Sequence, residues 1–256
     1  MKRRGSLYLE ALLPVVWMLF LVWTGVAFLV IPFDLGSAQL REWIHHEALR
    51  AALERIFRSV DATWILLAAV NTYFILVANE GLATARRWSA SLVFGSAVLA
   101  TAGATAGFPF GPITYTGNLG FRIVGILPYT IPLLWLVTVV NARYLILAIL
   151  PGASHWQRAL GVGAVALLTD LNLEFVAWKV RAYWIWYPGN LNRPDWPPLQ
   201  NYASWFVAGF LFSLLLSRWH TIAPGRRPVP AKALLILGLL NALYLGANIV
   251  RWLRIG

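Results

Sequence analysis

The sequence of 256 residues contains no cysteine, and only 10 of its residues are acidic. The absence of cysteine excludes disulfide bonds, iron–sulfur clusters, thiolate metal sites and a cysteine nucleophile. Only four histidines are present, and the neighbouring pair His45 and His46 would point in different directions on a helix. The sequence also has neither a GxGxxG pattern nor a Walker motif. We therefore expect no cofactor and no metal site.

Charged residues are scarce as well, at 12%, whereas hydrophobic residues make up 59% of the chain. Long apolar runs recur, and each is close to the roughly 20 residues that a helix needs to cross a bilayer. The sequence therefore predicts an all-α, polytopic membrane protein, built as one integral-membrane domain over residues 1–256. The seven expected spans are residues 7–32, 62–79, 88–106, 127–150, 156–179, 201–219 and 232–252. The first is too long for the apolar core of a signal peptide, so we expect it to be a retained anchor.

The segment between the first two spans, residues 37–59, has apolar residues at helical spacing among many charges. This pattern predicts an amphipathic helix at the membrane interface, or else a solvated connector helix. With seven spans, the same side of the membrane also receives the two long loops, residues 108–126 and 180–200. All the unusual loop sequence is therefore expected at one end of the bundle.

The net charge of +11 favours contact with membrane lipids that have anionic headgroups, and not with nucleic acid. Basic residues are divided almost evenly between the two sides of the predicted topology. The first span and the pair Arg86 and Arg87 favour an N-terminus inside, in the cytoplasmic membrane of a prokaryote. Four asparagines within the spans are expected to form hydrogen bonds between helices: Asn71, Asn141, Asn241 and Asn248.

Two acids, Asp170 and Glu174, interrupt the apolar sequence of the fifth span. At a spacing of four residues they would share one helical face, and Trp178 would continue the same stripe. Acids inside a membrane are costly to bury and often mark a functional site. The alternative is a structural ion pair with Arg143 or Arg181.

Two aromatic segments follow the third and fifth spans. The first, residues 107–115, has two prolines and includes Phe108, Phe110 and Tyr115, and the second, residues 183–188, includes Tyr183, Trp184 and Trp186. Such a segment could be an aromatic belt at the headgroup level. Because both flank the same end of the helix that carries the acids, we expect them to line an aromatic pocket beside Asp170 and Glu174.

Three segments, in this order, resemble the membrane carotenoid-biosynthesis family, which includes the carotenoid 1,2-hydratases that act on acyclic ends. Lycopene, γ-carotene and bisanhydrobacterioruberin hydratases are examples. The segments are FPFGPITYTGNLGFRIVGILPYTIPLLWL (108–136), LLTDLNLEFVAWKVRAYWIWYPG (167–189) and PPLQNYASWFVAG (197–209). The resemblance covers about residues 100–209. The chain departs from the family in two ways. It lacks a glutamate near Ala100, and it has Phe175 instead of proline after Glu174.

The resemblance implies a cofactor-independent hydro-lyase that adds water across the terminal C=C of an acyclic (ψ) carotenoid end group. Lycopene, γ-carotene or a C50 precursor would be the substrate, and other carotenoid-pathway enzymes are possible partners. Such a reaction needs an acid to protonate one carbon and a water molecule to capture the tertiary cation. A free aspartate has a pKa of about 3.9, but apolar burial and a nearby carboxylate favour the protonated form of an acid.

Asp170 is therefore expected to be the general acid and Glu174 its partner. Glu80, at the end of the second span, is either an interfacial cap or a further catalytic acid, and Tyr115 or Asn201 could bind the water. Aromatic faces would stabilise the cation, with Trp178 the first choice. The expected substrate-binding residues are Trp178, Trp184, Trp186, Phe108, Phe110, Tyr183, Asn201 and Trp205.

Two other functions fit the same sequence. An end-group cyclase or isomerase would use the same protonation and differ only in what captures the cation. A non-catalytic carotenoid or lipid carrier would use the acids as a proton relay, although such proteins often contain inverted repeats, and none is evident here.

Overall fold

The computed structural model describes residues 2–35, 37–188, 196–219 and 229–255. The helices in this part of the chain are α1 (Lys2–Val30), α2 (Ser37–Trp43), α3 (Glu47–Glu80), α4 (Leu82–Ala106), α5 (Thr130–Ile149), α6 (His155–Phe175), α7 (Leu199–Trp219) and α8 (Ala231–Ile255). Seven of them, all except α2, contain a stretch long and apolar enough to cross a membrane. The prediction of an all-α, multi-pass membrane protein is confirmed.

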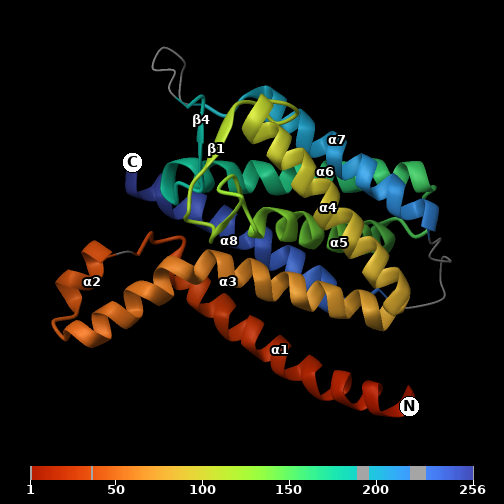
Figure 1. Ribbon diagram of the computed structural model, residues 1–256, viewed down its shortest axis with the longest axis horizontal. Coiled ribbons are helices and arrows are strands. Elements are labelled where there is room, and N and C mark those ends of the chain that lie inside the picture. Colours follow the sequence, from red (N-terminus) through yellow and green to blue (C-terminus); the bar gives the residue numbers. More distant parts are fainter. Residues whose placement is uncertain (1, 36, 189–195, 220–228, 256) are drawn as a thin grey trace.

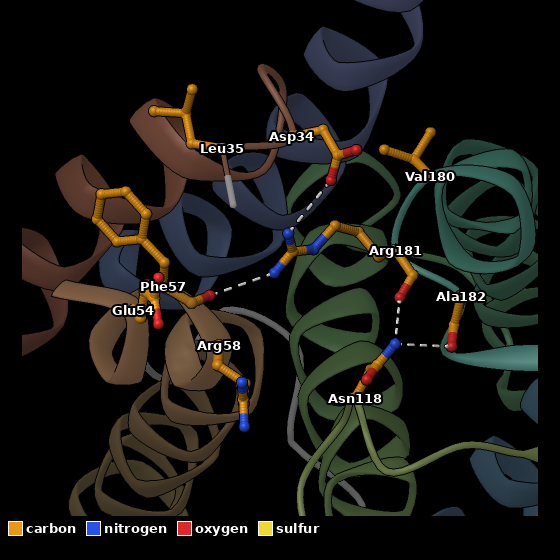
Figure 2. Close-up of a pocket in the computed structure, with 9 residues that line it drawn as sticks. All are labelled: Asp34, Leu35, Glu54, Phe57, Arg58, Asn118, Val180, Arg181 and Ala182. Atoms are coloured by element: carbon orange, nitrogen blue, oxygen red, sulfur yellow. Dashed lines mark hydrogen bonds and ion pairs between the residues drawn. The ribbon is translucent and has the colours of Figure 1, made fainter. Parts of the chain in front are cut away.

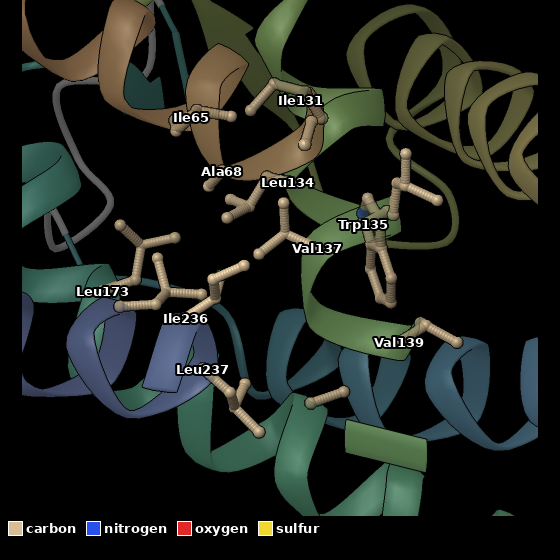
Figure 3. Close-up of a cluster of buried hydrophobic side chains, with 14 of the residues drawn as sticks. Ile65, Ala68, Ile131, Leu134, Trp135, Val137, Val139, Leu173, Ile236 and Leu237 are labelled. Atoms are coloured by element: carbon tan, nitrogen blue, oxygen red, sulfur yellow. The ribbon is translucent and has the colours of Figure 1, made fainter. Parts of the chain in front are cut away.

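Helix α5 lies at the centre of the bundle (Figure 1) and packs against α3, α4, α6 and α8. Its side chains are buried on nearly every side, as expected for a helix that is apolar all round. Figure 3 shows Leu134 and Val137 of α5 between Ile65 of α3 and Ile236 of α8. This apolar core fixes the positions of the helices that carry the acids.

Hydrogen bonds between asparagines and neighbouring helices add to this packing. Asn141 of α5 donates to Thr72 of α3 at 2.9 Å, and Asn248 of α8 donates to the carbonyl of Asn172 in α6 at 2.8 Å. Asn241 of α8 donates to Thr169 of α6, and Asn71 of α3 donates to the carbonyl of Val16 in α1. The expectation that all four asparagines join helices is confirmed.

The expected boundaries of the second span were wrong. The amphipathic segment is divided: α2 ends at Trp43, and α3 starts at Glu47 and continues as a single helix of 34 residues to Glu80. His46 is the N-cap of α3, and its Nδ1 accepts from the backbone N–H of Leu49 at 3.4 Å. Because residues 47–80 contain neither glycine nor proline, nothing in the sequence ends the helix between its charged and its apolar part.

The start of the fourth span also differs from the prediction. Residues Leu127–Pro128 form strand β3, which pairs with β2 (Arg122–Ile123), and α5 begins only at Thr130. Pro132 therefore lies in the first turn of α5, where its missing N–H removes no helical hydrogen bond.

The two long loops meet at one end of the bundle, as the topology predicts. Strand β1 (Ile113–Tyr115) of the first loop pairs antiparallel with β4 (Trp184–Trp186) of the second. In Figure 1, α2, the start of α3 and the C-terminus lie toward this end, and the N-terminus lies at the other. We call it the loop end.

Candidate active site

Asp170 and Glu174 lie on one face of α6, and both are buried, at 0% and 2% exposure. They accept hydrogen bonds from the same donor, Nδ2 of Asn201 in the first turn of α7, at 2.8 Å to Asp170 Oδ2 and 3.1 Å to Glu174 Oε2. The predicted spacing of the two acids on one helical face is confirmed. Sharing one donor makes the two carboxyl groups close neighbours inside the protein.

Small residues bring α6 and α7 close enough for this arrangement. A Cβ atom on Gly163 of α6 would lie 2.7 Å from the carbonyl oxygen of Phe206 in α7, and a Cβ on Gly209 would lie 2.7 Å from the Cβ of Ala166. Only glycine permits this approach of the two backbones at these positions. The close packing places Asn201 within hydrogen-bond distance of both acids.

Strand β4 supplies two further donors to Glu174. The indole Nε1 atoms of Trp184 and Trp186 donate to Glu174 Oε1 at 3.0 Å and 2.6 Å. Alternation along the strand puts both indoles on the buried face, whereas Ile185 between them is 50% exposed. The two tryptophans expected in the pocket therefore bind the acid directly.

Strand β1 places Tyr115 beside Trp184. Tyr115 pairs with Trp184 in the ladder, and their rings meet edge to face with centroids 6.1 Å apart. Burial raises the pKa of Tyr115 above its ordinary value, and charge on Glu174 and Asp170 raises it further. The phenol is therefore neutral and able to donate a proton in a hydrogen bond.

The loop before β1 is fixed to α7 by hydrogen bonds to its carbonyl groups. Ser204 donates to the carbonyl of Pro109 at 2.7 Å, and Gln200 donates to that of Gly107 at 3.2 Å. Gly111 has φ +109°, and a Cβ there would collide with the Pro198 ring, so this position requires glycine. Tyr115 and Asn201 are thereby held relative to each other.

Hydrogen bonding distinguishes the two acids. Glu174 accepts from three side-chain donors, two on Oε1 and one on Oε2. Asp170 accepts from Asn201 alone, and its Oδ1 is buried with no hydrogen-bond partner among the described residues. Several donors stabilise a carboxylate, whereas a buried oxygen without a donor is better suited to a carboxyl group that carries a proton.

Trp178 lies beyond the end of the regular α-helix. Helix α6 ends at Phe175 and continues as a π-helical turn, Val176–Val180, in which the backbone bonds reach one residue further. Trp178 is buried within this turn. Nζ of Lys179 lies 3.8 Å from the centroid of its ring, so a cation already occupies that face.

The other expected aromatic residues divide into two groups. Phe110 and Trp205 are buried and both pack near Trp135, with ring centroids 6.2 Å and 4.3 Å from it. Phe108, in contrast, is 71% exposed. Phe110 and Trp205 are therefore part of the packed interior at this end, and Phe108 is part of the surface.

Glu80 lies far from the two acids. Glu80 is the last residue of α3, at the side of the bundle opposite to the loop end. Its Oε1 accepts a hydrogen bond from the hydroxyl of Tyr144 at 3.0 Å. Asp61 of the same helix contacts Arg181 and Tyr183 of the second loop, and it is 19 residues from Glu80, or about 28 Å at 1.5 Å per residue. The structure therefore separates Glu80 from Asp170 and Glu174.

Arg143 and Arg181 do not form the ion pairs that the alternative interpretation requires. Arg181 binds Asp34 at 3.4 Å and the fully buried carboxylate of Asp61 at 2.5 Å. Figure 2 shows its guanidinium group between Asp34 and the carbonyl of Phe57. Arg143 donates to Ser213 and Ser217 and lies over the ring of Trp88.

Asp61 is a buried acid that the sequence analysis overlooked. It accepts from the hydroxyl of Tyr183, the residue immediately before β4, in addition to Arg181. Burial of Arg181 disfavours its charge, but Asp61, Tyr183 and Asp34 outweigh this effect and raise the pKa of Arg181. The cluster of Asp61, Arg181 and Tyr183 ties the start of β4 to α3, and its signal in the sequence is an acid directly before an apolar run.

Tyr202, next to Asn201, was also missed. It is partly exposed, and it is close enough to Asp170 and Glu174 to interact with their charges.

The model of the family described as "Carotenoid biosynthesis protein" matches residues 60–255 of this chain. The chain belongs to this family. The match includes Asp170, Glu174 and all their hydrogen-bond donors, and it extends well beyond the segments that carried the resemblance.

One curated relative is the bisanhydrobacterioruberin hydratase of Haloarcula japonica, which is 33% identical over 115 residues. The aligned region covers 44% of this chain and 38% of that protein, well under half of either. No solved structure matches the chain.

Proposed function

We propose that the chain is a carotenoid hydratase that adds water across the terminal C=C of an acyclic carotenoid end group. The observation that carries the proposal is the buried pair Asp170 and Glu174, which differ in their hydrogen bonding. The name of the Haloarcula japonica relative supports the same reaction class. The reaction needs an acid, a base and water, and the side chains of this site supply the first two.

Asp170 is the proton donor in this mechanism. Its proton, held on the oxygen that lacks a donor, passes to the less substituted carbon of the double bond. The electron pair of the double bond forms the new C–H bond and leaves a tertiary cation on the neighbouring carbon. Asp170 becomes a carboxylate at this stage, and Asn201 remains hydrogen-bonded to it.

Glu174 is the base that accepts a proton from water. The water oxygen forms a bond to the tertiary cation, one of its protons passes to Glu174, and the product is a tertiary alcohol. Transfer of that proton from Glu174 to its neighbour Asp170 restores the starting state. The sum of these steps is the addition of one water molecule.

The aromatic residues around the acids stabilise the cation without reacting with it. The indole N–H groups of Trp184 and Trp186 are fixed by Glu174, so the orientation of their rings is set before the substrate binds. An indole face attracts a desolvated cation by about 2 kcal/mol or more. We assign this role to Trp184 and Trp186 in place of Trp178, whose face already contacts Lys179. The hydroxyl of Tyr115 is the group that holds the water.

The test is to express the chain in cells that accumulate lycopene or γ-carotene and to measure the masses of the extracted pigments. The proposal predicts a product heavier by one water molecule. Asp170→Asn should abolish this product while the protein still accumulates in the membrane. Glu80→Gln is the matched control. It also neutralises a carboxyl group, but Glu80 lies at the end of α3 opposite to the loop end.

Other outcomes would contradict the proposal in distinct ways. An isomer of unchanged mass would identify a cyclase or isomerase that uses the same acid. Unchanged pigment, with the protein present and pigment bound to it, would identify a carrier. Product formation by Asp170→Asn that equals that of the unmodified chain would remove Asp170 from the mechanism.

A further inference from the structure

We propose that a cavity at the loop end binds the headgroup of an anionic phospholipid. The cavity has a volume of about 570 Å³ and lies between α3 and the loop that precedes α5. We call it the arginine cavity. Its lining residues include Arg55, Arg58 and Ser59 from α3, and Phe121, Arg122 and Tyr129 from the loop.

The lining is strongly positive. Arg55, Arg58 and Ser59 are spaced three and four residues apart, so they share one face of α3, and Arg122 lines the same cavity from the loop. No acid lines the cavity, and neither Arg55 nor Arg58 forms an ion pair with an acid in the described part of the chain. Three guanidinium groups without a bound carboxylate favour an anion, and they match the geometry of phosphate oxygens.

A second cavity, next to the arginine cavity, is lined by acids as well as by arginines. It has a volume of about 290 Å³ and is lined by Asp34 and Glu54 as well as by Arg58 and Arg181 (Figure 2). Its acids balance its arginines, and Asp34 already binds Arg181. An anion is therefore expected in the arginine cavity and not in this one.

Two contacts hold the wall of the arginine cavity in place before any ligand binds. Nη1 of Arg122 donates to the carbonyl of Tyr115 at 3.1 Å, which fixes the guanidinium group. The rings of Phe121 and Tyr129 are stacked, with centroids 4.6 Å apart. Gly120 has φ +98°, and a side chain there would overlap the ring of Tyr129. The site is therefore preorganised on the loop side.

The surroundings of the cavity favour a lipid over a free anion. Next to Arg122, the hairpin of β2 and β3 exposes Phe121 (70%), Ile123 (46%) and Val124 (88%). On α3, the charged part of the helix changes to the apolar span just beyond Arg58. Phosphate in the cavity and acyl chains beside these apolar side chains would satisfy both halves of a phospholipid. This inference concerns binding alone and does not depend on the proposed reaction.

The test is a titration of the purified full chain in neutral detergent, followed by native mass spectrometry of the lipid adducts. The probes are phosphatidylglycerol, phosphatidylcholine and inorganic phosphate. We expect a saturable phosphatidylglycerol adduct that is tighter than the phosphatidylcholine adduct. Arg55→Gln with Arg58→Gln should weaken it by about ten-fold or more, because two charged hydrogen-bond donors are lost.

The matched control is Arg86→Gln with Arg87→Gln, which removes the same charge from an exposed pair at the start of α4, away from the loop end. This variant should bind phosphatidylglycerol as the unmodified chain does. A second variant, Arg122→Gln, should also weaken binding and tests the cavity from the loop side. Thermal unfolding of each variant in detergent shows that it is folded.

Three results would overturn the proposal. Equal loss of binding in both double variants would mean that only net charge matters. Unchanged binding in Arg55→Gln with Arg58→Gln would mean that the lipid lies elsewhere. Displacement of phosphatidylglycerol by inorganic phosphate at equal concentration would identify a site for a free anion.

Discussion

Replacing Trp186 by phenylalanine removes one hydrogen bond to the carboxyl pair. The change keeps an aromatic ring on the buried face of β4 but removes the indole N–H that lies 2.6 Å from Glu174 Oε1. A hydrogen bond to a charged group contributes about 1.5–3 kcal/mol. Each 1.4 kcal/mol corresponds to a factor of ten, so stabilisation of the Glu174 carboxylate should weaken by about 10- to 100-fold.

With less stabilisation of its charge, Glu174 competes better for the proton that Asp170 must deliver. The proposed mechanism therefore predicts that the initial rate of pigment conversion falls by about ten-fold or more in Trp186→Phe. The measurement is conversion by membranes that contain equal amounts of each protein.

Trp88→Phe is the matched control for the loss of ring volume. Trp88 is equally buried, but its Nε1 has no hydrogen-bond partner among the described residues, so this change removes no such bond. It should leave the rate within about two-fold of that of the unmodified chain. Equal rates for Trp186→Phe and Trp88→Phe would refute the assigned role of the indole N–H.

Three further predictions concern the surroundings of the acids. Tyr115→Phe removes only the hydroxyl next to Trp184, so product formation should fall several-fold while the unfolding temperature in detergent stays unchanged; a fall in both would indicate a structural role. Asp61→Asn leaves Arg181 without its buried partner and should lower the free energy of unfolding by about 3–5 kcal/mol, measured by denaturation in detergent; a change below about 1 kcal/mol would contradict this reading of the cluster. Gly163→Ala places a methyl group 2.7 Å from the carbonyl oxygen of Phe206 and should destabilise the protein by about 1–3 kcal/mol. A variant as stable as the unmodified chain would show that α6 and α7 can separate without loss of stability.

The sequence was sufficient to predict the class of fold and the meeting of the two loops. Span length follows from the thickness of the bilayer, so apolar runs identify helices α1 and α3–α8 directly. Successive spans cross the membrane in opposite directions, so the loops after the first, third and fifth spans share a side. The pairing of β1 with β4 agrees with that argument.

Helix boundaries were predicted less well, because they depend on local signals that composition hides. The continuous helix α3 combines a charged and an apolar part, and hydropathy alone divides it near residue 60. The π-helical turn at Val176–Val180 leaves no clear signal in the sequence, and a continuous α-helix was expected there.

The sequence was sufficient to predict the two acids of the site and some of the residues around them. The spacing of Asp170 and Glu174 correctly placed both on one face, and Asn201 was expected near them. The role of Trp184 and Trp186 as donors to Glu174 could not be predicted, because it depends on the register of β4. Asp61 was missed because its partners, Arg181 and Tyr183, are about 120 residues away in the chain.

Conversion of lycopene in deuterated water tests the central claim most directly, namely that an acid of the protein transfers a solvent-derived proton to carbon. The mechanism predicts that each hydrated end group carries one deuterium that does not exchange when the pigment is returned to ordinary water. Asp170→Asn should yield no such label. A hydrated product without carbon-bound deuterium, or full labelling by Asp170→Asn, would contradict the mechanism.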